Sequence, residues 1–110
     1  MMEREFPLLV EKVGASPVLS SRQRTDMTAL LQSIGGEFEP LLERDAEAAR
    51  SALNFLNCAI WESVRKERTN ILAAAARKGM LLAFRPFEDS NPALVNQVYA
   101  LGDVLSALGV

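Results

Sequence analysis

The chain has 110 residues, of which 49% are apolar, 24% are charged and 6% are aromatic, and its formal net charge is −2. These values describe one folded domain of ordinary globular composition, and the small charge argues against a polyanionic partner such as nucleic acid. The sequence holds no histidine and one cysteine, which excludes an intrachain disulfide and removes the commonest general base and metal ligand.

Neither a signal peptide nor a membrane span is expected. The N-terminus is acidic and lacks an apolar core, and no uncharged apolar run approaches the roughly 18 residues that a spanning helix needs. We therefore expect a cytoplasmic protein, since a reducing compartment suits a single unpaired cysteine. That residue, Cys58, lies among apolar neighbours, and we expect its thiol to be buried as a small hydrophobic group.

Residues 1–24 are predicted to be a partly irregular N-terminal segment of a single helical domain that spans residues 1–110. The segment holds a short helix, expected over residues 6–13. Pro7 would occupy its first turn, where proline forfeits only an N–H that has no partner in the helix. Pro17 biases the residue before it away from helix, which predicts a connector at this point.

A second short helix is predicted to begin at residue 21 or 26 and to end at residue 34. Its apolar side chains recur at helical spacing and form one face. Two adjacent glycines, Gly35 and Gly36, are predicted to end this helix, because residues without a side chain form a permissive turn.

Residues 37–84 are the most informative stretch, because apolar residues recur through it at helical spacing. Pro40 is expected in its first turn, where proline is tolerated. One continuous helix would be about 70 Å long, which exceeds the size of a compact domain of this length. The alternatives are a continuous rod and two helices folded back or kinked near residues 68–70, with Thr69 or Asn70 as the cap of the second.

A last helix is predicted after a loop at residues 85–89, with Ser90 or Asn91 as its cap and Pro92 at its first position. A glycine inside this helix, Gly102, is expected to admit the close approach of another backbone. Together these elements predict an all-α protein. It would be either a small helical bundle or an elongated helical hairpin built around the long helix.

The apolar arc of the long helix is wider than the other predicted helices can cover. Apolar surface left over in this way marks an interface between proteins. We expect a protein partner to bind there, and a homodimer is the simplest way to cover the surplus. The predicted interface residues are Phe55, Leu56, Ile60, Trp61, Val64, Leu72 and Ala75.

The alternative is a nucleic-acid or anionic-surface binding face formed by the basic residues between Arg65 and Lys78. Acidic neighbours dilute this stretch, and no recognition helix or aromatic platform accompanies it. Without a catalytic, metal or phosphate motif, the sequence predicts a non-catalytic interaction module that needs no cofactor and no metal. An adaptor, a protein resembling a secretion chaperone, an anti-activator and an assembly subunit would all fit this description.

Overall fold

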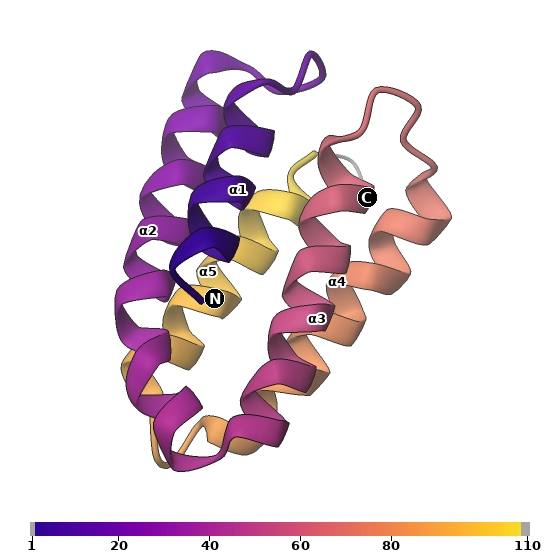
Figure 1. The fold of residues 1–110 in the computed structure, drawn as a ribbon. Coiled ribbons are helices and arrows are strands. Elements are labelled where there is room, and N and C mark those ends of the chain that lie inside the picture. Colours follow the sequence, from indigo (N-terminus) through magenta and orange to yellow (C-terminus); the bar gives the residue numbers. More distant parts are fainter. Residues whose placement is uncertain (1, 109–110) are drawn as a thin grey trace.

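The computed structural model describes residues 2–108, and this part of the chain folds into five α-helices and one short 3₁₀ helix, without strands. The helices are α1 (Met2–Gly14), α2 (Ser21–Arg44), α3 (Ala46–Val64), α4 (Asn70–Phe84) and α5 (Pro92–Ser106), with the 3₁₀ helix η1 at Arg85–Phe87. Each helix runs antiparallel to the one before it (Figure 1). The prediction of an all-α protein is confirmed.

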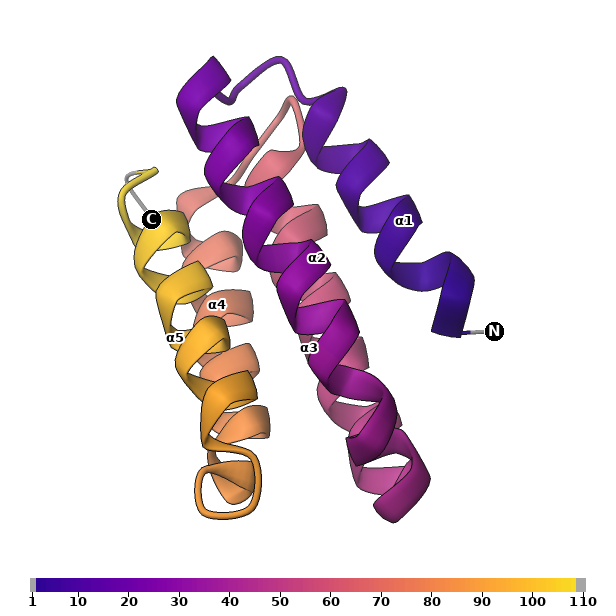
Figure 2. The ribbon, with the colours of Figure 1, turned by 90° about the vertical axis from the view of Figure 1, so that its left-hand side faces the viewer.

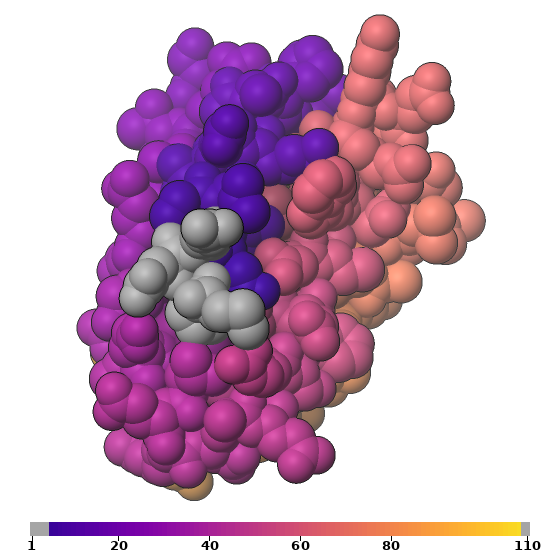
Figure 3. All heavy atoms as spheres, in the orientation of Figure 1, coloured from indigo at the N-terminus to yellow at the C-terminus, as the bar shows by residue number. Residues whose placement is uncertain are grey.

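Helices α2, α3, α4 and α5 form a four-helix bundle, in which α2 and α4 each pack against both α3 and α5 (Figures 1 and 2). Helix α1 lies outside this bundle and packs on α2 and α3. In the space-filling view its indigo atoms rest against the atoms of both helices (Figure 3). The molecule measures 36 × 25 × 20 Å, so the bundle alternative holds and the elongated hairpin does not.

Four phenylalanine rings form a row through the core. The ring centroids of Phe6 and Phe38 lie 5.7 Å apart, those of Phe38 and Phe84 6.3 Å, and those of Phe84 and Phe87 6.4 Å. Aromatic pairs at such separations contribute about 0.5–1.5 kcal/mol each beyond the burial of their area. Because the four rings come from α1, α2, α4 and η1, the row ties the added helix to the bundle.

The predicted helix end at the glycine pair is wrong, because α2 continues through Gly35 and Gly36 to Arg44. The buried stripe of α2 keeps its phase across the pair, and it consists of Met27, Leu31, Ile34, Phe38 and Leu41. Each interior glycine costs about 1 kcal/mol relative to alanine, and burying Phe38 and Leu41 outweighs that cost. Gly35 also serves packing, since a Cβ there would lie 3.0 Å from Cγ of Phe6.

Residues 37–84 therefore do not begin with a helix of their own, and they hold the end of α2 followed by α3 and α4. The chain breaks first at Asp45, whose carboxylate accepts a hydrogen bond of 3.3 Å from the backbone N–H of Ala48 and caps α3. Pro40 lies near the end of α2 instead of in a first turn. The carbonyl that it leaves without an N–H belongs to the exposed Gly36, where water can satisfy it.

The second break follows the folded-back alternative at the predicted place. Helix α3 ends at Val64 and α4 begins at Asn70, with Thr69 as the residue before its first turn. The hydroxyl of Thr69 makes no capping hydrogen bond. The loop is held from outside, because Arg68 donates a hydrogen bond of 2.8 Å to the carbonyl of Leu108.

The N-terminal helix begins earlier than predicted, at Met2, so Pro7 lies in its second turn. Between residues 2 and 24, residues 15–20 are the ones that lie outside a helix. This connector is fixed by Ser16, whose hydroxyl donates a hydrogen bond of 2.6 Å to the carbonyl of Val64 at the end of α3. It therefore anchors α1 to the same end of the bundle as the α3–α4 loop.

Helix α5 agrees with its prediction, because Asn91 precedes it and Pro92 is its first residue. Gly102 admits the side chain of Leu81 from α4, at 3.0 Å from where a Cβ would lie, and not another backbone. Among residues 2–108, no helix combines the length and the apolar character needed to cross a membrane.

Candidate interaction face

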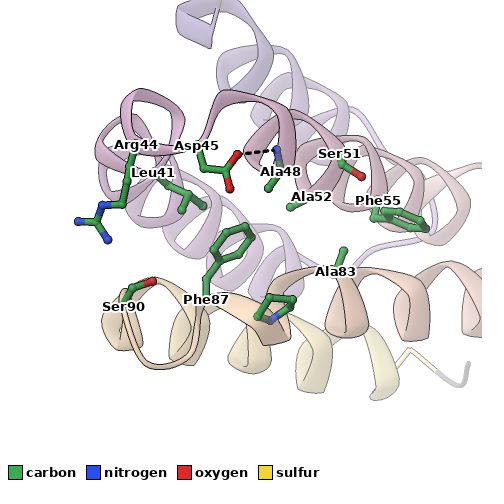
Figure 4. Close-up of a pocket in the computed structure, with 11 residues that line it drawn as sticks. Leu41, Arg44, Asp45, Ala48, Ser51, Ala52, Phe55, Ala83, Phe87 and Ser90 are labelled. Carbon is green, nitrogen blue, oxygen red and sulfur yellow. Dashed lines mark hydrogen bonds between the residues drawn. The ribbon is translucent and has the colours of Figure 1, made fainter.

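The described residues offer no cluster with obvious catalytic chemistry. Within residues 5–108, no three Cys, Asp or Glu side chains come close enough to hold a metal ion together. A groove of about 530 Å³ lies between the α2–α3 turn and η1 (Figure 4). Its polar lining is Arg44, Asp45, Ser51 and Ser90. Asp45 is already engaged as the cap of α3, and neither serine is hydrogen-bonded to a base, so this lining contains no activated nucleophile.

Three of the predicted interface residues belong to the core. Leu56, Ile60 and Val64 are buried, because α3 packs against α1, α2 and α4 and needs a broad apolar side of its own. They cannot form the surface of an interface, so the prediction is wrong for these three residues. Phe55, Trp61, Leu72 and Ala75 are exposed.

Trp61 lies apart from the other exposed residues of the predicted interface. Six residues separate it from Phe55, which turns it about 120° around the helix axis. Its ring faces α1, where the ammonium nitrogen of Lys12 lies 3.7 Å from the ring centroid. A cation over an indole face is an attractive contact, so Trp61 helps to close the edge between α1 and α3.

The remaining three residues do share one surface. The ring of Phe55 rests on α4 at Gly79, where a Cβ would lie 3.0 Å from its Cδ1 atom. Leu72 and Ala75 lie on the same side of α4 as Gly79, at helical spacing. Two residues that the sequence analysis missed, Ile71 and Leu82, complete this surface. We call it the α4 face, and it consists of Phe55, Ile71, Leu72, Ala75, Gly79 and Leu82.

The α4 face is exposed because α4 is apolar on almost every side. Its buried stripe is narrow and consists of Ala73, Ala76, Met80 and Phe84. The large apolar residues of α4 on its outer side are therefore exposed: Ile71 is 80% exposed, Leu82 61% and Leu72 52%. Phe55 of α3, whose ring rests on α4 at Gly79, is still 45% exposed. A helix that is apolar all round is normally buried, and this property was the signal that could have identified Ile71 and Leu82.

The expectation that Cys58 is buried is wrong, because its side chain is exposed. It lies two residues from both Leu56 and Ile60, and two residues correspond to about 200° of rotation around a helix. Since those two side chains face the core, Cys58 faces the opposite way. It lies three residues from Phe55, on the outer side of α3 and next to the α4 face.

The basic residues of the alternative prediction do not form one continuous face. Arg65 pairs with Glu62 at 3.1 Å, and Arg68 is bonded to the carbonyl of Leu108. Arg77 and Lys78 lie on α4, two turns from the loop that carries the others.

Charge is distributed unevenly between the two ends of the α3–α4 hairpin. The α3–α4 loop carries Arg65, Lys66 and Arg68 against one acid, Glu67. At the opposite end of the bundle, the α2–α3 turn and the start of α3 carry Glu43, Asp45 and Glu47 against one cation, Arg44. We refer to these as the basic loop and the acidic turn.

The flank of α4 that faces α5 carries a polar contact beside Leu82 of the α4 face. Tyr99 donates a hydrogen bond to the carboxylate of Glu88, and a shallow groove lies beside this pair. The bond and the charge of Glu88 raise the pKa of the Tyr99 hydroxyl above its usual range, together with partial burial. Arg85 acts in the opposite direction and lowers the same pKa to a smaller extent.

Comparison with protein-family models, with curated proteins and with solved structures finds no match for this chain. The α4 face, the basic loop and the acidic turn are therefore the features of the molecule that indicate its function.

Proposed function

We propose that this protein is a non-catalytic helical interaction module that binds another protein through the α4 face. The observation that carries the proposal is the exposure of four large apolar side chains on the α3–α4 hairpin, which no other element within residues 2–108 covers. With about 150–200 Å² for each large side chain, their exposed fractions amount to roughly 350–500 Å². Apolar patches of this size on a monomer are often functional.

Several roles use such a face, including those of an adaptor, an anti-activator, a subunit of an assembly and a chaperone that holds a secreted protein. A cytoplasmic location stays a prediction from the sequence. Nucleic-acid binding through the residues between Arg65 and Lys78 gains no support, because Arg65 and Arg68 already have partners inside the chain.

The experiment that tests the proposal is site-specific photo-crosslinking in the cells that produce the protein. A photoreactive residue at position 71, the most exposed point of the α4 face, should form covalent adducts with protein. The matched control places the same residue at Leu8, an exposed leucine on α1. Adducts at position 71 but not at position 8 support the proposal. Adducts at neither position overturn it, and an adduct at 71 that nuclease removes would support the nucleic-acid alternative instead.

A further inference from the structure

We infer that the partner on the α4 face is a second copy of this chain, related by a two-fold axis that makes the two α4 helices antiparallel. This inference rests on the proposed function and deepens it. Four observations carry it: the spacing of residues along α4, the register between α3 and α4, the distribution of charge and the size of the face.

The apolar residues of the α4 face are arranged symmetrically along the helix. Leu72, Ala75, Gly79 and Leu82 are separated by three, four and three residues, so the pattern is symmetric about position 77. Turning α4 end over end places Leu72 opposite the partner's Leu82 and Ala75 opposite the partner's Gly79. A two-fold interface sets a surface against itself, so only a self-complementary face can form one. Small residues at the centre also let the two helices approach closely.

The register of the hairpin places Cys58 at the proposed axis. Phe55 on α3 lies against Gly79 on α4, and the two helices are antiparallel. Position 77 on α4 is therefore level with position 57 on α3. Cys58 is one residue away from that level, which is about 1.5 Å along the helix. Because its side chain is exposed on the outer side of α3, the two Cys58 residues of the dimer would lie close together.

Charge favours the antiparallel arrangement over a parallel one. Lys66 in the basic loop lies nine residues beyond position 57, and Glu47 near the acidic turn lies ten residues before it. The two-fold axis therefore sets Lys66 beside the partner's Glu47. A parallel pairing of the α4 helices would instead set one basic loop beside the other, and like charges in contact disfavour association.

The area of the face fits a dimer of standard size. A stable interface buries about 800 Å² on each partner, and about 65% of that area is apolar in homodimers. The four large side chains of the α4 face supply most of that apolar share. Ala75, Gly79 and the aliphatic part of Lys78 lie beside these four side chains and add further apolar area to the interface.

The first measurement is molar mass by light scattering behind size exclusion, over a range of concentrations. The expected value is twice the chain mass of 12.1 kDa. Leu82→Glu should weaken the dimer by about 100-fold or more, because both copies lose an apolar contact and gain a charge at the interface. Leu8→Glu is the matched control, since Leu8 and Leu82 are both 61% exposed. A wild type that stays monomeric, or a Leu8→Glu variant that dissociates instead, overturns the inference.

Two further measurements test the antiparallel geometry. A short bismaleimide should join two wild-type chains through Cys58, the one cysteine of the sequence. Lys66→Cys in a Cys58→Ser background should not be joined, because the two positions would lie about 27 Å apart along the helices. The reverse result would overturn the proposed axis.

Charge reversal examines the same geometry from the ends of the interface. Lys66→Glu alone and Glu47→Lys alone should each weaken the dimer several-fold, and the double variant should restore it, because the opposite charges again face each other across the axis. If the double variant loses as much dimer affinity as the two single variants together, the proposed pairing of Lys66 with Glu47 is contradicted.

The failure of this inference can be distinguished from the failure of the proposed function. A monomer in light scattering whose residue 71 still crosslinks to a different protein overturns the second copy and keeps the α4 face as a binding site. A monomer without crosslinks overturns both.

Discussion

Two glycines in this protein each receive a phenylalanine ring at the same distance, but the two rings differ in how they are covered. A Cβ at Gly35 would lie 3.0 Å from Cγ of Phe6, and a Cβ at Gly79 would lie 3.0 Å from Cδ1 of Phe55. Phe6 is 7% exposed and Phe55 is 45% exposed. The α2 side of the bundle is closed by an additional helix, whereas the α4 side is left open.

This difference shows that a helix glycine that makes room for a phenylalanine ring can serve two purposes. On α2 the missing side chain lets α1 seat its ring in the core and complete the row of phenylalanines. On α4 it lets the ring of Phe55 contact the helix at Gly79, where the ring widens an apolar surface and stays 45% exposed. A partner on the open side would therefore cover the apolar surface of α4, as α1 covers that of α2.

The largest expected difference between the two sides comes from removing the rings. Phe6→Ala should lower the free energy of unfolding by about 3 kcal/mol, because it leaves a cavity in the core. Phe55→Ala should lower it by about 1 kcal/mol, because only part of that ring is removed from water. Urea unfolding in a Leu82→Glu background keeps association out of the comparison. Equal losses at the two positions would contradict the idea that only one side is closed.

A smaller but more specific difference comes from filling the glycines. Gly35→Ala should destabilise the fold, since its Cβ would meet the base of a buried ring that cannot move. Gly79→Ala should stabilise the monomer by up to about 1 kcal/mol, because alanine favours helix and the exposed ring of Phe55 can turn away. Gly36→Ala, which meets open space, calibrates the intrinsic gain. The test is the sign of each change in thermal unfolding, and a gain at Gly35 would refute the close packing of α1.

Gly79→Ala should at the same time weaken the proposed dimer, since Gly79 opposes the partner's Ala75 at its centre. Higher stability with lower affinity in one variant would be hard to explain by damage to the fold. If the affinity rises together with the stability, the helices do not approach each other at this point.

The sequence could predict the features that local chemistry decides. Helical spacing indicated an all-α chain, and the excessive length of one continuous rod favoured a break near residues 68–70, where the loop between α3 and α4 lies. The glycine pair led to a wrong helix end. The free-energy cost of two glycines in a helix can be read from the local sequence, but the burial of Phe38 and Leu41 outweighs that cost. This burial depends on helices that are distant in the sequence. Pro40 was misplaced for the same reason, since it was assigned to the start of a helix that in fact continues from residue 21.

The site could be predicted only in part, because core residues and interface residues have the same chemistry. The stripe that contains Leu56 and Ile60 has the same sequence pattern whether another helix of the chain or a partner protein covers it. Phe55 and Leu72 were identified by their apolar character, but their exposure depends on which side of the hairpin the core occupies. The orientation of Cys58 follows from that same choice, which explains why its burial was predicted wrongly.

The contact between Lys12 and Trp61 tests the edge at which α1 closes the bundle. Lys12→Gln should cost about 0.5 kcal/mol, a typical value for a cation over an exposed aromatic ring, and should change the emission of Trp61. The chain has one tryptophan, so the signal is unambiguous. Lys78→Gln on α4 is the control and should leave the emission unchanged. An unchanged emission in Lys12→Gln would contradict the contact between Lys12 and Trp61.

The smallest expected effect is the titration of Tyr99, which reports on the flank of α4 that faces α5. Its pKa is raised because the protonated hydroxyl donates to the carboxylate of Glu88, so this contact favours the fold below about pH 10 and is lost as the pH rises through the raised pKa. Glu88→Gln should move the midpoint of phenolate absorbance down toward the usual value, and Glu43→Gln should not. An unchanged midpoint in Glu88→Gln would show that the contact between Tyr99 and Glu88 does not set this pKa.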